Sequence, residues 1–231
     1  VQTCALPISA GGGTVRDVLI GRPVFWISDQ TYMLAAFGAA LAGKRSACVM
    51  KHVGVNVAAD PLFTIAYTGV NAGMVICVAD DPGMHSSQNE QDNRHYARAA
   101  KIAMVEPSDA QECKDFVALA CEVSELFDTP VLYRTTTRVC HSKGLVEFGQ
   151  RTEHTHAPYA RNVRKFVCTP AHAYANHPLV EERLRRLEEA LNTLSAQLNN
   201  DVITELNKKV DIDHQSPQQV ARDFLRSKQL L

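Results

Sequence analysis

Short apolar runs that break abruptly into polar loops are the feature that most constrains the fold of this chain. The clearest run is MVICVA, residues 74–79, and similar runs occupy residues 46–50, 102–105 and 130–139. An apolar run of this length is typical of a strand buried on both faces. Because segments with helical spacing separate the runs, the strands must lie parallel. The sequence therefore predicts an α/β fold, a parallel sheet with helical crossovers.

Local signals mark several boundaries of the intervening segments. Pro61 suits the first turn of a helix that Gly69 would end. Ser108 and Gln111 form a capping box that opens the most regular helix. We expect KHVGVN to be a loop after the first strand, and the fourth strand to run out as far as His141.

The polar residues that follow the strands form the candidate site. Carboxyl ends of parallel strands open on one edge of a sheet, where ligands of such folds bind. For three aspartates, 80, 81 and 92, bracing of a turn or helix is an equally good interpretation. For Lys51, His52 and His85 we favour function, because no local bond explains these residue types there. The edge gathers Lys51, His52, Asn56, Asp80, Asp81, His85, Gln88, Glu90, Asp92, Glu106, Arg138 and His141.

Charge and cysteine spacing exclude several classes of protein. A formal net charge of -1 gives no excess of basic residues for binding nucleic acid. The seven cysteines include no C-x-x-C pair, so we predict no disulfide framework and a reducing, cytoplasmic location. His154 and His156 lack further ligands at suitable spacing, which favours a solvated loop, and we predict no metal site in these residues.

The amino-terminal segment differs from the rest. Gly11, Gly12 and Gly13 match neither the dinucleotide fingerprint nor a P-loop, so a flexible turn is the better interpretation. The words GGGTVRD and GRPVFW resemble small bacterial membrane proteins related to trimeric intracellular cation channels. The longest apolar run, residues 32–43, is too short to span a bilayer alone, which takes roughly 20 apolar residues.

The carboxyl-terminal segment is predicted to be helical. Apolar residues between Val180 and Leu198 alternate four and three residues apart, which favours an amphipathic helix packed on its own domain over a coiled-coil partner helix. Ser216 and Pro217 begin another helix with an apolar face at Val220. This tail is similar to the carboxyl end of substrate-binding proteins of osmoprotectant ABC importers, without their aromatic box for quaternary ammonium ions.

The central block carries the most specific resemblance. The words KHVGVN, DDPGMHSSQNEQDNRHYARAAKI and FDTPVLYRTTTRVCH closely resemble the alpha subunit of indolepyruvate:ferredoxin oxidoreductase, from about Gly43 to about Glu189. The resemblance implies the thiamine-diphosphate pyrimidine-domain type of fold and oxidative decarboxylation of aryl 2-oxoacids to acyl-coenzyme A. It also implies magnesium with the cofactor, [4Fe-4S] clusters in the full subunit, and a beta subunit and ferredoxin as partners.

The resemblance also implies roles for individual residues. Lys51, His52 or Arg138 would take the substrate carboxylate, and the loop after the second strand would close the pocket or face a partner. Asp29 takes the place of the family's activating glutamate, but its neighbours belong to the channel-like segment, so we leave the catalytic residue unassigned. Cofactor or substrate binding is implied for Lys51, His52, Asn56, His85, Gln88, Glu90, Asp92, Arg138 and His141.

Other parts of the family pattern are missing from the sequence. It contains no Gly-Asp-Gly word for magnesium diphosphate and no cysteine cluster. We therefore expect a fragment that is inactive alone. Its expected parts are a foreign segment 1–41, a pyrimidine-binding domain 42–170, a connector 171–190 and a helical tail 191–231. The alternatives are a non-catalytic transport or binding protein, either importer component or channel, and a chimeric product without a function of its own.

Overall fold

The computed structural model describes residues 31–150, 154, 158–228 and 230. The glycines at 11–13, Asp29 and His156 therefore lie outside the described residues. The chain divides into two compact units, Val1–Leu184 and Arg185–Leu231.

A four-stranded parallel sheet in the order β1-β2-β4-β3 forms the centre of the first unit. Its central strand β2 shows no alternation of buried and exposed residues, because helices cover both faces: Met74, Val75 and Ile76 are fully buried. The predicted parallel α/β fold is confirmed. The strands are β1 (Ser46–Lys51), β2 (Met74–Asp80), β3 (Ala103–Val105) and β4 (Val131–Thr136).

Two separate apolar cores lie on the two faces of this sheet. On one face, α3 (Thr31–Leu41), α5 (Ala59–Thr68) and α6 (Asn93–Ala100) contribute to a core that includes Met33, Leu62, Ile65, Ile76, Ala97 and Leu132. On the other face, α7 (Ala110–Phe127) packs Ala120 and Cys121 against Val75, Val131 and Tyr133. Gly69 ends α5 as predicted, with a positive φ of 69° and no room for a side chain beside Asp128.

The fourth strand and the segment after β1 differ from the prediction. β4 stops at Thr136, which pairs with Asp80, the last residue of β2. Beyond that point no neighbouring strand is left to pair with, and the chain turns into α8 (Thr137–His141). The KHVGVN segment forms a short helix, α4 (His52–Val57), because folding it this way buries Val53 and Val55.

The cap of α7 is also displaced by one residue. Asp109, rather than Ser108, is the N-cap, and its side chain accepts a hydrogen bond of 2.8 Å from the Glu112 amide. The Glu112 carboxylate in turn accepts from the Ser108 amide at 2.7 Å. Asp109 and Glu112 therefore take the places predicted for Ser108 and Gln111, although the Glu112 carboxylate binds the residue before the N-cap rather than the N-cap itself. Gln111 instead donates to Asp115.

The carboxyl-terminal helices confirm some of the tail's predicted features. After α9 (Val163–Phe166), α10 (Pro170–Ser195) begins in the first unit, where Val180 is 2% exposed and packs as expected. Further along the same seam Leu191 is 63% exposed. The second unit adds α11 (Asn200–Asp211) and α12 (Pro217–Ser227), and Ser216 caps α12 as predicted. Among the described residues, no helix combines the length and apolarity needed to cross a membrane.

Candidate functional site

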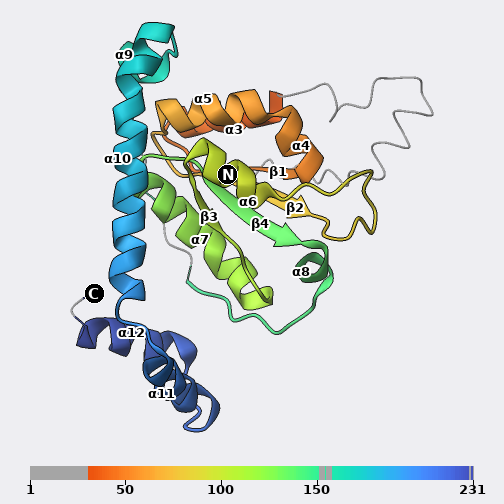
Figure 1. Ribbon diagram of the computed structural model, residues 1–231, viewed down its shortest axis with the longest axis vertical. Helices are drawn as coiled ribbons and strands as arrows, with labels where there is room; N and C mark the ends of the chain where they lie inside the picture. The colour runs from red at the N-terminus through yellow and green to blue at the C-terminus, as the bar shows by residue number, and fades with distance from the viewer. Residues whose placement is uncertain (1–30, 151–153, 155–157, 229, 231) are drawn as a thin grey trace. The chain divides into compact units, whose positions relative to one another are not determined.

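The carboxyl ends of the strands bring the predicted site residues to one edge of the sheet. Figure 1 shows α4, the loop between β2 and α6, and α8 together at the arrowhead end of the strands. We call residues 81–92 the 81–92 loop. The predicted residues divide into those that bind other parts of the protein and those that do not.

Three residues, the last of β1 and two of α4, bind the 81–92 loop. The Lys51 ammonium donates a hydrogen bond of 2.8 Å to the Ser86 carbonyl, and the Asn56 amide donates one of 3.2 Å to Gln91. Between them, His52 is fully buried, with Nε2 lying 3.0 Å from the Asn89 carbonyl oxygen. These side chains therefore hold the loop in the described structure.

Glu90 and Asp92 are likewise bonded to protein. Glu90 accepts a hydrogen bond of 3.1 Å from the Gly83 amide inside the loop. Asp92 is the N-cap of α6 and accepts from both the backbone and the guanidinium of Arg94. The hydrogen bond from the Arg94 side chain is the main reason that the pKa of Asp92 is lowered to about 2.

Asp81 braces the beginning of the loop. Its carboxylate accepts hydrogen bonds from the Ser87 hydroxyl at 2.6 Å, the Ser86 amide at 2.7 Å and the His85 amide at 3.2 Å. The Thr137 hydroxyl donates to it at 2.8 Å, which ties the loop to α8. These donors, that of Ser87 first, hold the pKa of Asp81 well below its usual range. The geometry agrees with the bracing interpretation of this residue.

A buried ionic cluster lies beneath the loop. Arg134, whose side chain is 4% exposed, donates to Asp80 at 2.6 Å and pairs with Glu106. Asp80 also accepts from the backbone amide of Asn93 at 3.0 Å and from its side chain at 2.5 Å. Sequence reasoning did not select Arg134 or Asn93, although an arginine at the end of the apolar run VLYR was a usable signal, since a buried cation needs a partner.

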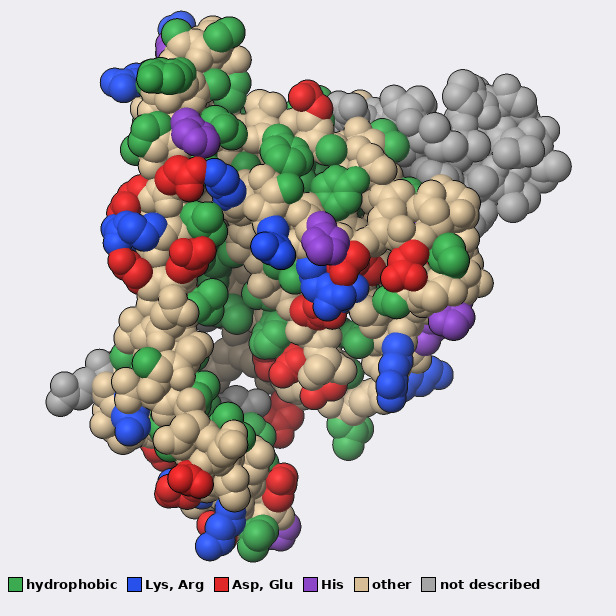
Figure 2. All heavy atoms as spheres, viewed as in Figure 1, with side chains coloured by type: hydrophobic (Ala, Val, Ile, Leu, Met, Phe, Trp, Pro, Cys, Tyr) green, Lys and Arg blue, Asp and Glu red, His purple; other side chains and the backbone are tan. Residues whose placement is uncertain are grey.

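The remaining predicted residues are free. His85 and Gln88 in the 81–92 loop, and Arg138 and His141 on α8, are exposed and have no side-chain hydrogen bond or ion pair within the described part of the chain. Figure 2, in the same view, shows basic and histidine side chains gathered over the region of α8. Hydrogen-bond donors thus predominate among the side chains available to a ligand at this edge.

The donor set limits the kinds of ligand that the described edge could hold. Imidazole, amide and guanidinium groups suit the ring nitrogens and amino group of an aminopyrimidine, or a carboxylate. No group of acidic, histidine or cysteine side chains in the described ranges could hold a metal ion. The free side chains of the described edge therefore suit a ligand rich in hydrogen-bond acceptors, such as a carboxylate or the ring nitrogens of an aminopyrimidine.

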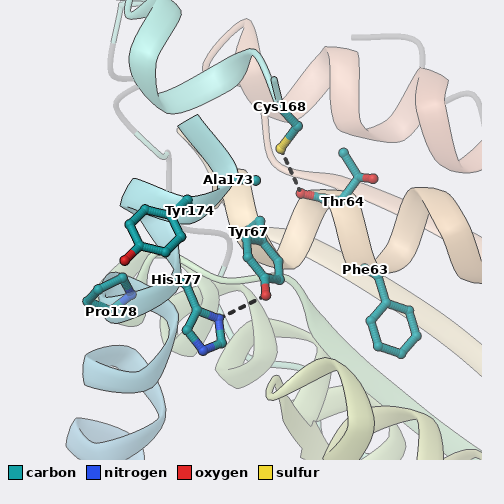
Figure 3. A pocket seen from close by; sticks show the side chains of 8 residues that line it. All are labelled: Phe63, Thr64, Tyr67, Cys168, Ala173, Tyr174, His177 and Pro178. Atoms are coloured by element: carbon teal, nitrogen blue, oxygen red, sulfur yellow. Dashed lines mark hydrogen bonds between the residues drawn. The ribbon is translucent and has the colours of Figure 1, made fainter. Parts of the chain in front are cut away.

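A separate apolar cavity lies between α5 and the first turns of α10. It has a volume of about 610 Å³, and the Tyr67 hydroxyl and His177 Nδ1 lie 2.9 Å apart at its side (Figure 3). None of the predicted site residues lines it. Its lining consists of Phe63, Thr64, Tyr67, Cys168, Ala173, Tyr174, His177 and Pro178.

Two protein families match the chain. Residues 28–202 match the family described as pyruvate flavodoxin/ferredoxin oxidoreductase, thiamine diphosphate-binding. Residues 1–43 match the family described as glycine transporter, and the resemblance of the amino-terminal words to channel-related membrane proteins stays a prediction. Neither match concerns an ABC importer, and the longer one ends at Val202, within the segment 191–231 for which an importer resemblance was expected.

Curated relatives agree with the longer match. The indolepyruvate oxidoreductase subunit IorA of Archaeoglobus fulgidus is 49% identical over 202 residues, covering 84% of this chain and 32% of its own length. The subunit of the same name in Methanothermobacter marburgensis is 45% identical over 185 residues, covering 79% of this chain. That of Pyrococcus horikoshii is 42% identical over 172 residues, covering 72%.

The chain spans 26–32% of the length of these relatives. The matched residues nevertheless include most of the chain, the whole parallel sheet and every predicted site residue. The chain therefore belongs to the pyruvate flavodoxin/ferredoxin oxidoreductase family of thiamine-diphosphate-binding domains.

Proposed function

We propose that this chain forms the pyrimidine-side wall of the thiamine-diphosphate site in an oxidoreductase that acts on aryl 2-oxoacids such as indolepyruvate. The overall reaction would be oxidative decarboxylation to acyl-coenzyme A, with electrons passed to ferredoxin. One observation carries the proposal. His85, Gln88, Arg138 and His141, which have no side-chain hydrogen bond or ion pair among the described residues, lie together at the carboxyl edge of a sheet of this family, where ligands of parallel sheets bind.

The free side chains would act by binding and orientation. Arg138 presents a planar guanidinium that can hold a carboxylate through two parallel hydrogen bonds, so it is the proposed ligand of the 2-oxoacid carboxylate. His85 and Gln88 lie on the loop that would cover the pyrimidine. His141 is on the same short helix as Arg138 and would add a second donor to the anion.

We propose that the chain alone is inactive. Activation of thiamine needs a carboxylate placed against the pyrimidine ring, which promotes removal of the thiazolium proton. At the described edge, Asp80, Asp81, Glu90, Asp92 and Glu106 are all bonded to other protein groups. Magnesium, [4Fe-4S] clusters, coenzyme A and a beta subunit enter the proposal through the family and would be held outside the described edge.

Ligand titration followed by nuclear magnetic resonance tests the proposal. Thiamine and indolepyruvate are added separately to the isotope-labelled chain. We expect each ligand to bind with a millimolar dissociation constant and to shift the amide resonances of His85, Gln88, Arg138 and His141. Thiamine diphosphate with magnesium, used in place of thiamine, should not bind with a dissociation constant in the micromolar range. Shifts confined to the cavity around Tyr67, or no shifts at all, would contradict the proposal.

The alternative function is non-catalytic transport or binding, which rests on the glycine transporter match of residues 1–43. A thermal melting series separates it from the first proposal. Glycine, glycine betaine or choline should raise the melting temperature of a binding protein for these solutes. If the oxidoreductase proposal is correct, none of the three should stabilise the chain more than sodium chloride at the same concentration.

A further inference from the structure

We propose that His52 is a positioning residue, which holds the 81–92 loop so that Gln88 and His85 lie at the carboxyl edge of the sheet. Its importance for ligand binding rests on the proposed function above. The contact on which it depends can be tested on the chain without any ligand. No substrate atom needs to touch His52 for this role.

The imidazole of His52 lies between two carbonyl oxygens. Nε2 is 3.0 Å from the oxygen of Asn89 in the loop, and Nδ1 is 3.4 Å from that of Ala79 on β2. Both oxygens are acceptors, whereas a neutral imidazole donates from only one nitrogen. The shorter distance is that of a normal N–H···O hydrogen bond, so the geometry favours the tautomer with its proton on Nε2, directed at the loop.

The other contacts of the loop show what depends on His52. Asp81 fixes the beginning of the loop, at His85, Ser86 and Ser87. The stretch from Gln88 to Gln91 is bonded from outside the loop by His52 and, at its end, by the Asn56–Gln91 contact. The Asn56 contact is exposed, so water competes for it, whereas His52 is fully buried.

The competing explanation is that His52 only fills space in the core. Amide substitutions separate the two roles, because glutamine can place its NH2 group near the position of Nε2 and asparagine near that of Nδ1. If His52 acts through Asn89, H52Q retains the tether and H52N loses it. If His52 only fills space, the larger cavity left by asparagine should loosen the core amides of β2 at least as much as the loop.

Hydrogen exchange of the ligand-free chain measures the tether. The informative amide is that of Gly83, which donates to Glu90, the residue that follows Asn89. We expect H52N to speed its exchange about fivefold to tenfold, as for the loss of one hydrogen bond, and H52Q to change it by less than about twofold. H95Q and H95N are matched controls on the exposed face of α6, and both should leave the loop unchanged.

A measurement on the unaltered chain covers the case in which H52N does not fold. Nitrogen-15 spectra of the imidazole ring report which nitrogen carries the proton. A proton on Nε2 that exchanges slowly with water supports the proposal. A proton on Nδ1, or equal exchange of Gly83 in foldable H52N and H52Q, would overturn it. Failure of the proposed function would appear differently, as the absence of ligand-induced shifts in the unaltered chain.

Discussion

The 81–92 loop and helix α8 follow neighbouring strands at the same edge of the sheet, yet their side chains are used differently. The loop is bonded to β1, to α4 and to itself through Lys51, His52, Asp81 and Glu90. In α8, Thr137 binds Asp81, while Arg138 and His141 are exposed and have no side-chain partner among the residues that the structure describes. Position at a ligand edge therefore does not distinguish residues that hold the edge together from residues available to a ligand.

The largest expected effect concerns the buried cluster beneath the loop. Arg134→Ala removes the cation from Asp80, whose side chain is 2% exposed. An uncompensated buried charge costs about 3–5 kcal/mol of the free energy of unfolding, which urea denaturation would measure. Arg94→Ala, which breaks the exposed pair with Asp92, is the control and should cost less than about 1 kcal/mol. Equal losses of unfolding free energy in the two variants would show that the buried cluster does not stabilise the fold more than an exposed ion pair does.

The next effect tests the link between the loop and α8. Thr137→Val keeps the shape of the side chain but removes the hydroxyl that donates to Asp81. We expect a loss of about 0.5–1.5 kcal/mol in unfolding free energy, the value of one hydrogen bond. Thr136→Val, at the end of β4, is the matched control. If the two valine variants unfold at the same urea concentration, the loop and α8 are not coupled through this contact.

A smaller effect appears in the dependence of stability on pH. The folded-state pKa of Asp92, about 2, lies below its unfolded value of about 3.9. A lowered carboxyl pKa adds stability that is present above about pH 4 and is lost as the pH falls toward 2. Asp92→Asn, which can still cap α6, should therefore flatten the decline of unfolding free energy between pH 4 and pH 2. An unchanged slope would mean that Arg94 does not stabilise this carboxylate in solution.

The smallest effect on stability is expected where the side chains are free. Arg138→Ala and His141→Ala should change the unfolding free energy by less than about 0.5 kcal/mol, because neither side chain has a hydrogen bond or ion pair to lose within the described ranges. Arg138→Ala should nevertheless reduce the shifts that indolepyruvate induces in resonance spectra. A large destabilisation by either variant would show that these α8 side chains, like those of the loop, stabilise the fold.

Much of the fold could be predicted because its signals are local. The apolar run of β2 needed no knowledge of its neighbours, and Gly69 and Ser216 mark helix boundaries through their own backbone preferences and hydrogen bonds. The prediction that β4 would reach His141 was wrong because its end depends on another strand. β2 stops at Asp80, and pairing stops with it at Thr136.

The sequence by itself determined the parallel α/β class, the order of elements along the chain and the edge at which polar residues collect. It could do so because the hydrophobic period and the crossover geometry are properties of short segments and their connections. Only the tertiary structure decided which of those polar residues are free. Asn89 lies 37 residues from His52 along the chain, and Arg134 lies 54 residues from Asp80. Burial and hydrogen-bond partners at such separations arise from packing, so no local pattern distinguishes a bound histidine from an available one.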